Sequence, residues 1–169
     1  MARWGNCDYR QLQRLQQKLN KLQSGDVDAF CKGCAKELAA RLLTKVIKRT
    51  PVGQYDIGAG KVGGTLRRGW TAKSSREAEL STVFNAKPTN IRDYVDTLQI
   101  SKSGSMYQIE IINPVEYAPY VEFGHRTANH KGWVPGRFML TISEQELESQ
   151  APQILERKIK RYLEGIFSD

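Results

Sequence analysis

The chain has 169 residues, of which 40% are hydrophobic and 26% are charged. This composition is ordinary for a globular protein of one domain, and it excludes a collagen, a transmembrane bundle and a wholly disordered chain. There are 26 Lys and Arg against 18 Asp and Glu, a formal net charge of +8, with +7 in residues 1–50 and −2 in residues 138–169. Such a basic balance favours a polyanion, a membrane surface or an acidic protein as partner.

The cysteines and the apolar runs bear on where the protein is made. Cys7, Cys31 and Cys34 are odd in number, so they cannot all pair within the chain, and they indicate a reducing compartment. No apolar run is long enough to span a membrane, and the N-terminus lacks the apolar stretch of a signal peptide. We therefore expect a protein made in the cytoplasm, with no membrane partner.

Two helices are predicted at the start of the chain. The first covers residues 8–23, with Asp8 as its N-cap and four leucines at heptad spacing. The second covers residues 26–49, because apolar residues recur there every three or four positions. Thr50-Pro51 ends the second helix, since proline lacks the backbone donor that a helix needs. Both helices are rich in Lys and Arg.

The centre of the chain is predicted to be a loop followed by a strand. Residues 51–64 contain five glycines and form the loop. Residues 65–73 alternate between apolar and polar side chains, which predicts a strand. Residues 74–90 are ambiguous, because the segment from Glu77 to Phe84 fits either a helical turn or an edge hairpin.

The clearest β pattern lies between residues 91 and 123. Residues 94–100 and 106–112 are predicted strands, joined by a hairpin loop at residues 101–105. The apolar, aromatic segment at residues 115–123 continues this region and ends at a glycine.

The last part of the chain is predicted to be a polar loop at residues 125–137 and then a helix over residues 137–167, with a break or kink at Pro152. The predicted apolar face of that helix consists of Phe138, Leu140, Ile142, Leu147, Ile154, Leu155, Ile159, Leu163 and Ile166.

The order of elements predicts an α+β fold. A small antiparallel sheet of about four strands is packed by N-terminal and C-terminal helices and carries long loops. We expect residues 1–25 to be a basic helical appendage and residues 26–169 to be one α+β domain.

Two motifs that are typical of binding sites occur here in secondary structure that does not suit those sites. Gly-Ala-Gly-Lys-Val-Gly at residues 58–63 spells G-x-G-x-x-G, but it follows a helix and precedes a strand, the reverse of a dinucleotide site. Cys31-x-x-Cys34 could form a zinc site with His125 and His130. Both cysteines lie within a predicted helix, however, so we expect buried thiols instead.

The remaining residues give no positive case for an enzyme. No Asp or Glu lies between Glu122 and Glu144 to bind a divalent ion beside the His125 to His130 segment, which argues against a nuclease. The basic helices could bind nucleic acid through phosphates, but few aromatic residues accompany them for base stacking. We therefore expect no catalytic residue, no cofactor-binding residue and no metal site, and a solvated or acid-docking face is the favoured interpretation of the basic helices.

Four segments together resemble a known protein family. They are Thr-Pro-Val at residues 50–52, Gly-Thr-Leu-Arg-Arg-Gly-Trp at 64–70, Tyr-Ala-Pro-Tyr-Val-Glu-Phe-Gly-His at 117–125 and Val-Pro-Gly-Arg-Phe-Met-Leu at 134–140. In these segments the chain resembles the tail-completion, or head–tail joining, proteins of tailed bacteriophages, also called minor tail or neck proteins. The resemblance spans residues 26–165.

The chain also departs from that family in several places. Many members have a proline between the residues that match Arg137 and Phe138, and this chain does not. Residues 55–64 and 125–134 look like insertions, and the predicted helix at residues 8–23 lies outside the matched core.

The resemblance implies a structural virion protein of the phage neck. Such a protein would form a ring, expected to be a homohexamer, that completes the tail and joins it to the head. Its implied partners are other copies of itself, the tail tube or tail terminator protein, and the head connector or stopper protein. DNA would pass through the lumen without sequence readout. The alternative hypothesis is a basic nucleic-acid-binding protein, followed by an enzyme.

The resemblance and the residue pattern together suggest a subunit or ring interface. In this prediction the three aromatic residues at 117, 120 and 123 build the core and the subunit boundary, and Glu122 pairs with Arg137 or Arg68. The basic first helices and the acidic stretch at residues 144–148 are candidate opposing faces of a ring. The expected interface residues are Tyr117, Tyr120, Glu122, Phe123, Arg137, Arg67, Arg68, Trp70, Lys131 and Trp133.

Overall fold

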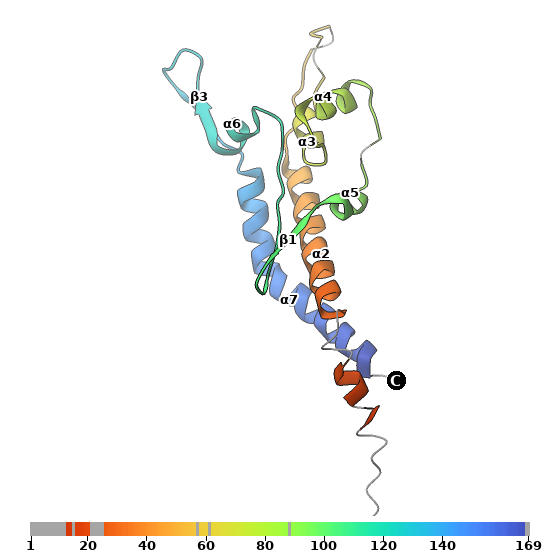
Figure 1. Cartoon of the computed structure of the whole chain (residues 1–169). Coiled ribbons are helices and arrows are strands. Elements are labelled where there is room, and N and C mark those ends of the chain that lie inside the picture. Colours follow the sequence, from red (N-terminus) through yellow and green to blue (C-terminus); the bar gives the residue numbers. More distant parts are fainter. Residues whose placement is uncertain are drawn as a thin grey trace, which may run out of the picture.

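Two long antiparallel helices form the body of the molecule (Figure 1). They are α2, Asp26–Arg49, and α7, Met139–Phe167. Helices α3 (Thr65–Gly69), α4 (Ser75–Val83) and α6 (Ala118–Phe123) and strand β3 (Gly124–Arg126) lie around one end of this pair (Figure 1). Helix α5 (Ile91–Thr97) and strand β1 (Ile100–Ser103) lie beside α2. The computed structural model describes residues 13–14, 16–20, 26–56, 58–60, 62–87 and 89–167.

The first predicted helix lies largely outside the described residues. Residues 13–14 and 16–20 are helical, whereas Asp8 and the leucines at 12, 15 and 22 are not among the residues described. The ammonium group of Lys18 donates to the carbonyl of Phe167 at 3.3 Å, which places this segment beside the end of α7. No helix within the described part of the chain is long and apolar enough to cross a membrane.

Helix α2 confirms the prediction for residues 26–49. Its inner face carries Leu43 and Val46, both fully buried, and the antiparallel α7 packs beside it. Ion pairs join the two helices at both ends of their contact, with Arg49 to Glu146 at 2.6 Å and Lys158 to Glu37 at 3.1 Å.

The predicted strand at residues 65–73 is wrong. Thr65–Gly69 forms a short helix, α3, which begins after Gly64 in the left-handed region at φ 108°. The alternation of apolar and polar side chains was misleading, because Leu66 and Trp70 are four residues apart and both are buried on one face of a helical turn.

The ambiguous segment that follows is helical. Helix α4, Ser75–Val83, begins at the N-cap Ser74, whose side chain accepts a hydrogen bond from the backbone of Glu77. The carboxylate of Glu77 in turn accepts from the backbone N–H of Lys73 at 2.8 Å. These two hydrogen bonds run in opposite directions across the first turn of α4 and together cap its N-terminus. This local capping explains the choice of helix over hairpin.

The predicted β region is only partly β. Residues 94–97 belong to helix α5, Ile91–Thr97, which the side chain of Asn90 caps. Strand β1, Ile100–Ser103, pairs in antiparallel register with β2, Met106–Ile109. A hairpin at this place and its second strand are confirmed, but the first strand lies mostly within the predicted loop at residues 101–105.

The segment at residues 115–123 is not a strand either. Ala118–Phe123 forms helix α6, and Pro119 lies in its first turn, where proline is well tolerated. The predicted polar loop after it contains a second antiparallel hairpin, formed by β3, Gly124–Arg126, and β4, Trp133–Pro135.

The α+β class is therefore confirmed, but the single sheet of about four strands is wrong. The described strands form two separate two-stranded sheets, β1–β2 and β3–β4. Three predicted strand segments became helices, because local caps and the burial of one helical face outweigh alternation over a short stretch.

Helix α7 confirms the prediction for the C-terminal region and continues through Pro152. Its buried face differs from the predicted one, since it consists of Met139, Ser143, Leu147 and Ile154. Phe138 precedes the helix and is exposed, and Ile142 is also on the outer side.

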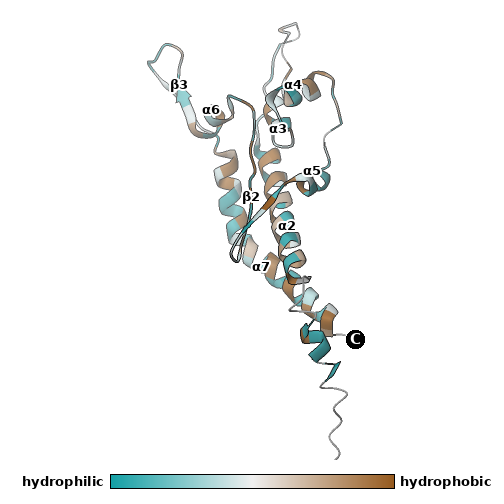
Figure 2. Ribbon diagram, in the orientation of Figure 1, coloured by the Kyte–Doolittle hydropathy of each residue, from teal (hydrophilic) through white to brown (hydrophobic). Residues whose placement is uncertain are grey.

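The core lies where α2, α3, α4 and the start of α7 meet, and apolar residues on the facing sides of the helices line it (Figure 2). Trp70 is the largest of its side chains and is 4% exposed. The other buried members are Ala39, Leu43, Val46, Leu66, Ala72, Ala78, Val95, Val115, Ala118 and Met139.

Candidate subunit and ring interface

The Thr-Pro and Leu-Arg-Arg-Gly-Trp segments meet in the folded chain. The indole N–H of Trp70 donates to the hydroxyl of Thr50 at 2.7 Å, and that hydroxyl donates to the carbonyl of Val46 at 2.7 Å. The guanidinium of Arg67 donates twice to the carbonyl of Thr50, at 2.7 and 3.1 Å. The fully buried Thr50 is therefore satisfied, and the two segments form one polar junction at the end of α2.

A second junction joins α6, the β3–β4 hairpin and α7. The carboxylate of Glu122, which is 6% exposed, accepts from the backbone N–H groups of Leu140 and Thr141 at 3.0 and 2.9 Å. It also accepts from the hydroxyl of Thr141 at 2.9 Å. Glu122 therefore caps the N-terminus of α7 across the chain and stabilises its dipole.

The predicted pairing of Glu122 with Arg137 or Arg68 is wrong. Arg68 instead donates to the carbonyl of Ala86 at 2.7 Å. Glu122 binds the start of α7 because the residue there cannot cap the helix. Phe138 occupies the position before α7, with φ 48°, and its side chain has no hydrogen-bond acceptor. The free N–H groups of α7 therefore take the buried carboxylate.

The base of the β3–β4 hairpin is closely packed against α6. A Cβ at Gly136 would overlap the backbone of Glu122 and Phe123. The backbone N–H groups of Arg137 and Phe138 donate to the carbonyls of Val121 and Glu122 at 2.8 and 3.0 Å. The hairpin is thereby held at its base while its tip projects from the body (Figure 1).

Aromatic side chains are exposed around this junction. Tyr120, Phe123 and Trp133 are 59%, 62% and 61% exposed, and Tyr117 is 45% exposed. The Tyr120 ring meets the His125 ring edge-on at 6.0 Å between centroids. Partial burial raises the pKa of the Tyr117 hydroxyl. The expectation that residues 117, 120 and 123 build the core is therefore wrong within one chain, although their exposure suits a boundary.

The ten predicted interface residues divide into three groups. Trp70 and Glu122 are buried and make their contacts within the chain. Arg67 and Arg68 are half-buried and bind backbone carbonyls. The remaining six are exposed near α6 and the β3–β4 hairpin: Tyr117, Tyr120, Phe123, Lys131, Trp133 and Arg137. We call these six the aromatic end surface.

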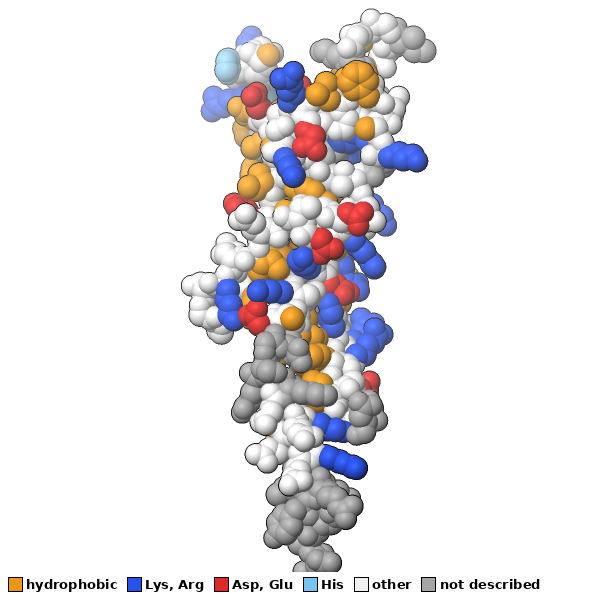
Figure 3. Space-filling model, turned by 45° about the vertical axis from the view of Figure 1, so that its right-hand side comes forward, with side chains coloured by type: hydrophobic (Ala, Val, Ile, Leu, Met, Phe, Trp, Pro, Cys, Tyr) orange, Lys and Arg blue, Asp and Glu red, His pale blue; other side chains and the backbone are white. Residues whose placement is uncertain are grey.

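A further exposed apolar group was not predicted. Leu80, Val83 and Phe84 lie at the C-terminal end of α4, and Phe84 is 75% exposed. The i, i+3, i+4 spacing of these residues is the sequence pattern that indicates one helical face. It did not lead to a prediction, because the segment fitted a helical turn and a hairpin equally well. Figure 3 shows apolar side chains gathered at the same end of the molecule.

Most cations of α2 are engaged within the chain. Lys32 pairs with Asp28 at 2.8 Å, and Lys36 pairs with Asp96 at 2.8 Å. Arg41 pairs with Glu37 at 2.7 Å, and its guanidinium is the main reason that the pKa of Glu37 is lowered. Lys45 and Arg49 both bind Glu146. The basic excess at the start of the sequence is thus partly used to assemble the fold.

The four residues considered as possible zinc ligands are not brought together, as the expectation of helical thiols requires. Cys31 and Cys34 are free thiols near the start of α2, whereas His125 lies on β3 at the other end of the molecule (Figure 1). Burial raises the pKa of the Cys34 thiol. No cluster of three potential ligands occurs among the residues that the structure describes.

The comparisons with known proteins identify one family. Residues 13–124, about two thirds of the chain, match the family model described as "Bacteriophage HK97-gp10, putative tail-component". No curated protein and no solved structure gave a match. The family match begins within the first predicted helix, which the resemblance placed outside the core, and it ends at the start of β3. The chain therefore belongs to the HK97-gp10-like family of bacteriophage tail components.

Proposed function

We propose that this tail component forms a homohexameric ring that completes the phage tail and joins it to the head connector. Membership of a family of structural tail components gives the setting, a virion. The aromatic end surface is the observation that carries the proposal. Aromatic side chains this exposed are typical of a surface that another protein covers.

The aromatic end surface combines a rigid base with a polar rim. Glu122 and Gly136 fix the hairpin against α6 and α7, so the exposed rings are presented in one arrangement. Lys131 and Arg137 are exposed beside the rings. A central aromatic group with charged residues at its edge is the usual composition of a protein–protein interface.

In this proposal the aromatic end surface contacts a neighbouring ring of the virion, either the tail tube or terminator or the head connector or stopper. DNA would pass through the lumen by non-specific contacts. The chain contributes structure and no catalysis. Because α2 and α7 pack against each other, we treat residues 26–169 as the folded domain and residues 1–25 as its appendage.

Deletion of the gene from the phage tests the proposal. We expect the deletion to yield filled heads and separate tails, counted by electron microscopy, and a wild-type copy supplied in trans to restore joined particles. Joined, infectious particles in the absence of the protein would contradict the proposal.

A paired substitution locates the contact. The W133A and F123A substitutions remove rings that are more than half exposed, so the purified proteins should keep the wild-type unfolding transition. We expect both to fail to restore joining. M106A, which removes an exposed apolar side chain from the other hairpin, is the control and should restore joining. If a variant that carries both W133A and F123A still restores full joining of heads and tails, the contact with the neighbouring ring lies elsewhere on the protein.

A further inference from the structure

A groove lies between α2 and α5. Its α2 wall includes Glu37, which also binds Lys158 of α7 at 3.1 Å. The groove has a volume of about 650 Å³. Ala40, Thr44 and Val95 form its less polar part, and charged side chains from both helices surround them. The groove is separate from the aromatic end surface, which α6 and the β3–β4 hairpin provide.

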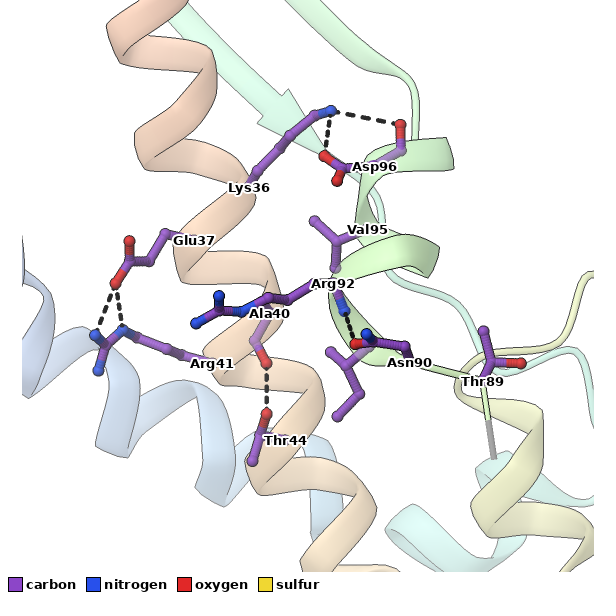
Figure 4. A pocket seen from close by; sticks show the side chains of 11 residues that line it. Lys36, Glu37, Ala40, Arg41, Thr44, Thr89, Asn90, Arg92, Val95 and Asp96 are labelled. Carbon is purple, nitrogen blue, oxygen red and sulfur yellow. Dashed lines mark hydrogen bonds and ion pairs between the residues drawn. The ribbon is translucent and has the colours of Figure 1, made fainter. Parts of the chain in front are cut away.

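Three cations line this groove, and two of them are already paired. Lys36 binds the carboxylate of Asp96, and Arg41 binds that of Glu37 (Figure 4). Arg92 reaches from α5 towards Ala40 on α2. Among the described residues, no hydrogen bond or ion pair to the guanidinium of Arg92 is present. The groove therefore holds one positive charge in excess, on a side chain that is free to take an anion.

The N-terminal part of α7, residues 139–156, is the acidic counterpart. Residues 139–156 contain four glutamates and no Lys or Arg. Glu146 is neutralised by Lys45 and Arg49, and the lysine hydrogen bond is the main reason that its pKa is lowered. Glu144 and Glu148 are exposed, lie one helical turn apart on one face, and have no ion pair within the described part of the chain.

These two surfaces have the placement that a closed ring requires. Helices α5 and α7 flank α2 on opposite sides (Figure 1), and among the described residues no ion pair joins Arg92 to Glu144 or Glu148 of the same copy. A cyclic ring uses heterologous contacts, in which two different faces of each subunit meet. Opposite charges on opposite faces favour this head-to-tail arrangement over a two-fold dimer.

We propose that the α2–α5 groove binds the acidic face of α7 from the next copy of this chain, with Arg92 of one copy facing Glu144 and Glu148 of the other. This inference rests on the ring proposed above and assigns its lateral contact. It leaves the aromatic end surface for the rings above and below. The proposed docking cation is therefore Arg92 on α5, whereas most of the cations on α2 are paired within the chain.

Charge reversal in the phage tests the contact. In a phage lacking the gene, we expect plasmid-borne R92E, and separately E144K/E148K, to lower the titre by on the order of a hundredfold, because like charges then face each other across the interface. The triple variant R92E/E144K/E148K restores opposite charges at every contact and should restore the titre. Supplying R92E and E144K/E148K together should also restore the titre, because copies of the two proteins that alternate around the ring bring opposite charges together at each contact.

Controls separate folding from docking. Arg92 lies in the first turn of α5, where a glutamate is favoured by the helix dipole, so R92E should keep the wild-type unfolding transition. K160E makes the same change of charge at an exposed position outside the groove and should support the full titre.

Cross-linking gives an independent readout on purified particles. R92K keeps the charge and supplies an amine, which a carbodiimide joins directly to a neighbouring carboxylate. We expect mass spectrometry to find a peptide that links position 92 to Glu144 or Glu148. A link from position 92 to a different virion protein would overturn the proposal.

The outcomes distinguish this inference from the proposed function. If the deletion abolishes joining but R92E and E144K/E148K restore it fully, the groove contact is wrong and the ring proposal stands. If each charge reversal fails and the triple variant fails too, the groove binds something other than α7, and the inference is again overturned. If the deletion itself has no effect on joining, the proposed function is wrong.

Discussion

The two β-hairpins of this chain are similar in size but are held in different ways. Hairpin β1–β2 is tied to α2 by Asp28, whose carboxylate accepts from Lys102 and from the hydroxyl of Tyr107, both at 2.6 Å. Its Ile109 packs against the core. Hairpin β3–β4 is held only near its base, and Trp133 and Val134 on its second strand are exposed.

This difference teaches which hairpin belongs to the body and which is available to a partner. A hairpin of three or four residues per strand is barely stable alone, so each needs support from outside its own ladder. The core and an ion pair support β1–β2. A cap and a glycine-lined junction support β3–β4 and leave its apolar side chains uncovered. The three predictions below test this contrast.

The largest effect is expected at the base of β3–β4. E122A removes the acceptor for two backbone N–H groups and one hydroxyl at the start of α7, and it should lower the free energy of unfolding by about 2–4 kcal/mol. Chemical denaturation measures the change. E122Q keeps an acceptor oxygen and should cost less, and E116A, at an exposed glutamate nearby, should be close to neutral. Equal stability of E122A and E116A would contradict the capping role.

A matched pair compares the two hairpins directly. I109A uncovers part of the core and should cost about 1–2 kcal/mol, since the side chain is only partly buried. V134A acts on a side chain that is 40% exposed and should change the free energy of unfolding by less than about 0.5 kcal/mol. If V134A proves as costly as I109A in the isolated protein, β3–β4 is part of the body after all.

The smallest effect concerns the ion pair that ties β1–β2 to α2. Hydrogen bonds from Lys102, Lys32 and Tyr107 hold the pKa of Asp28 well below its ordinary value of 3.8. A carboxyl group with a lowered pKa in the folded state stabilises the protein above its unfolded-state pKa, and this contribution is lost as the pH falls towards the folded-state value.

D28N therefore should be less stable than the wild type near neutral pH, and the difference should shrink as the pH falls below about 4. Urea denaturation at several pH values measures both proteins. The lowered pKa values of Glu37 and Glu146 make both proteins acid-sensitive, so the test is the difference between them. If the difference in free energy of unfolding between D28N and the wild type stays constant from pH 6 to pH 3, the charge of Asp28 does not stabilise the contact between β1–β2 and α2.

The predictable parts of the fold have strong local signals. Helices α2 and α7 repeat their apolar residues over many turns, and the glycine-containing turn between β1 and β2 follows β-rich residues. The segments at residues 65–73 and 115–123 were misassigned as strands because they are short. Over one or two turns, alternation and helical spacing select overlapping sets of residues, and burial on a neighbouring element decides between them.

The candidate interface was predictable in composition but not in arrangement. The aromatic residues at 120, 123 and 133 were found because they belong to a motif or lie beside one. Their exposure depends on α6 being a helix and on β3–β4 pointing away from the body. Arg92 carried no sequence signal, since an isolated arginine in a mixed segment is unremarkable until its neighbours Lys36 and Arg41 prove to be paired.

The sequence by itself determined the α+β class, the two long helices, the first hairpin and the resemblance to phage tail proteins, because these depend on local periodicity and on strings of residues. Only the tertiary structure decided how the charge of +8 is used. It paired most cations of α2 with acids on α2, α5 and α7 and gave Glu122 to the N-terminus of α7. Among the described residues it gave the guanidinium of Arg92 no ion pair. Ion pairs and caps join residues far apart in the chain, and no local pattern records which partner each charge will find.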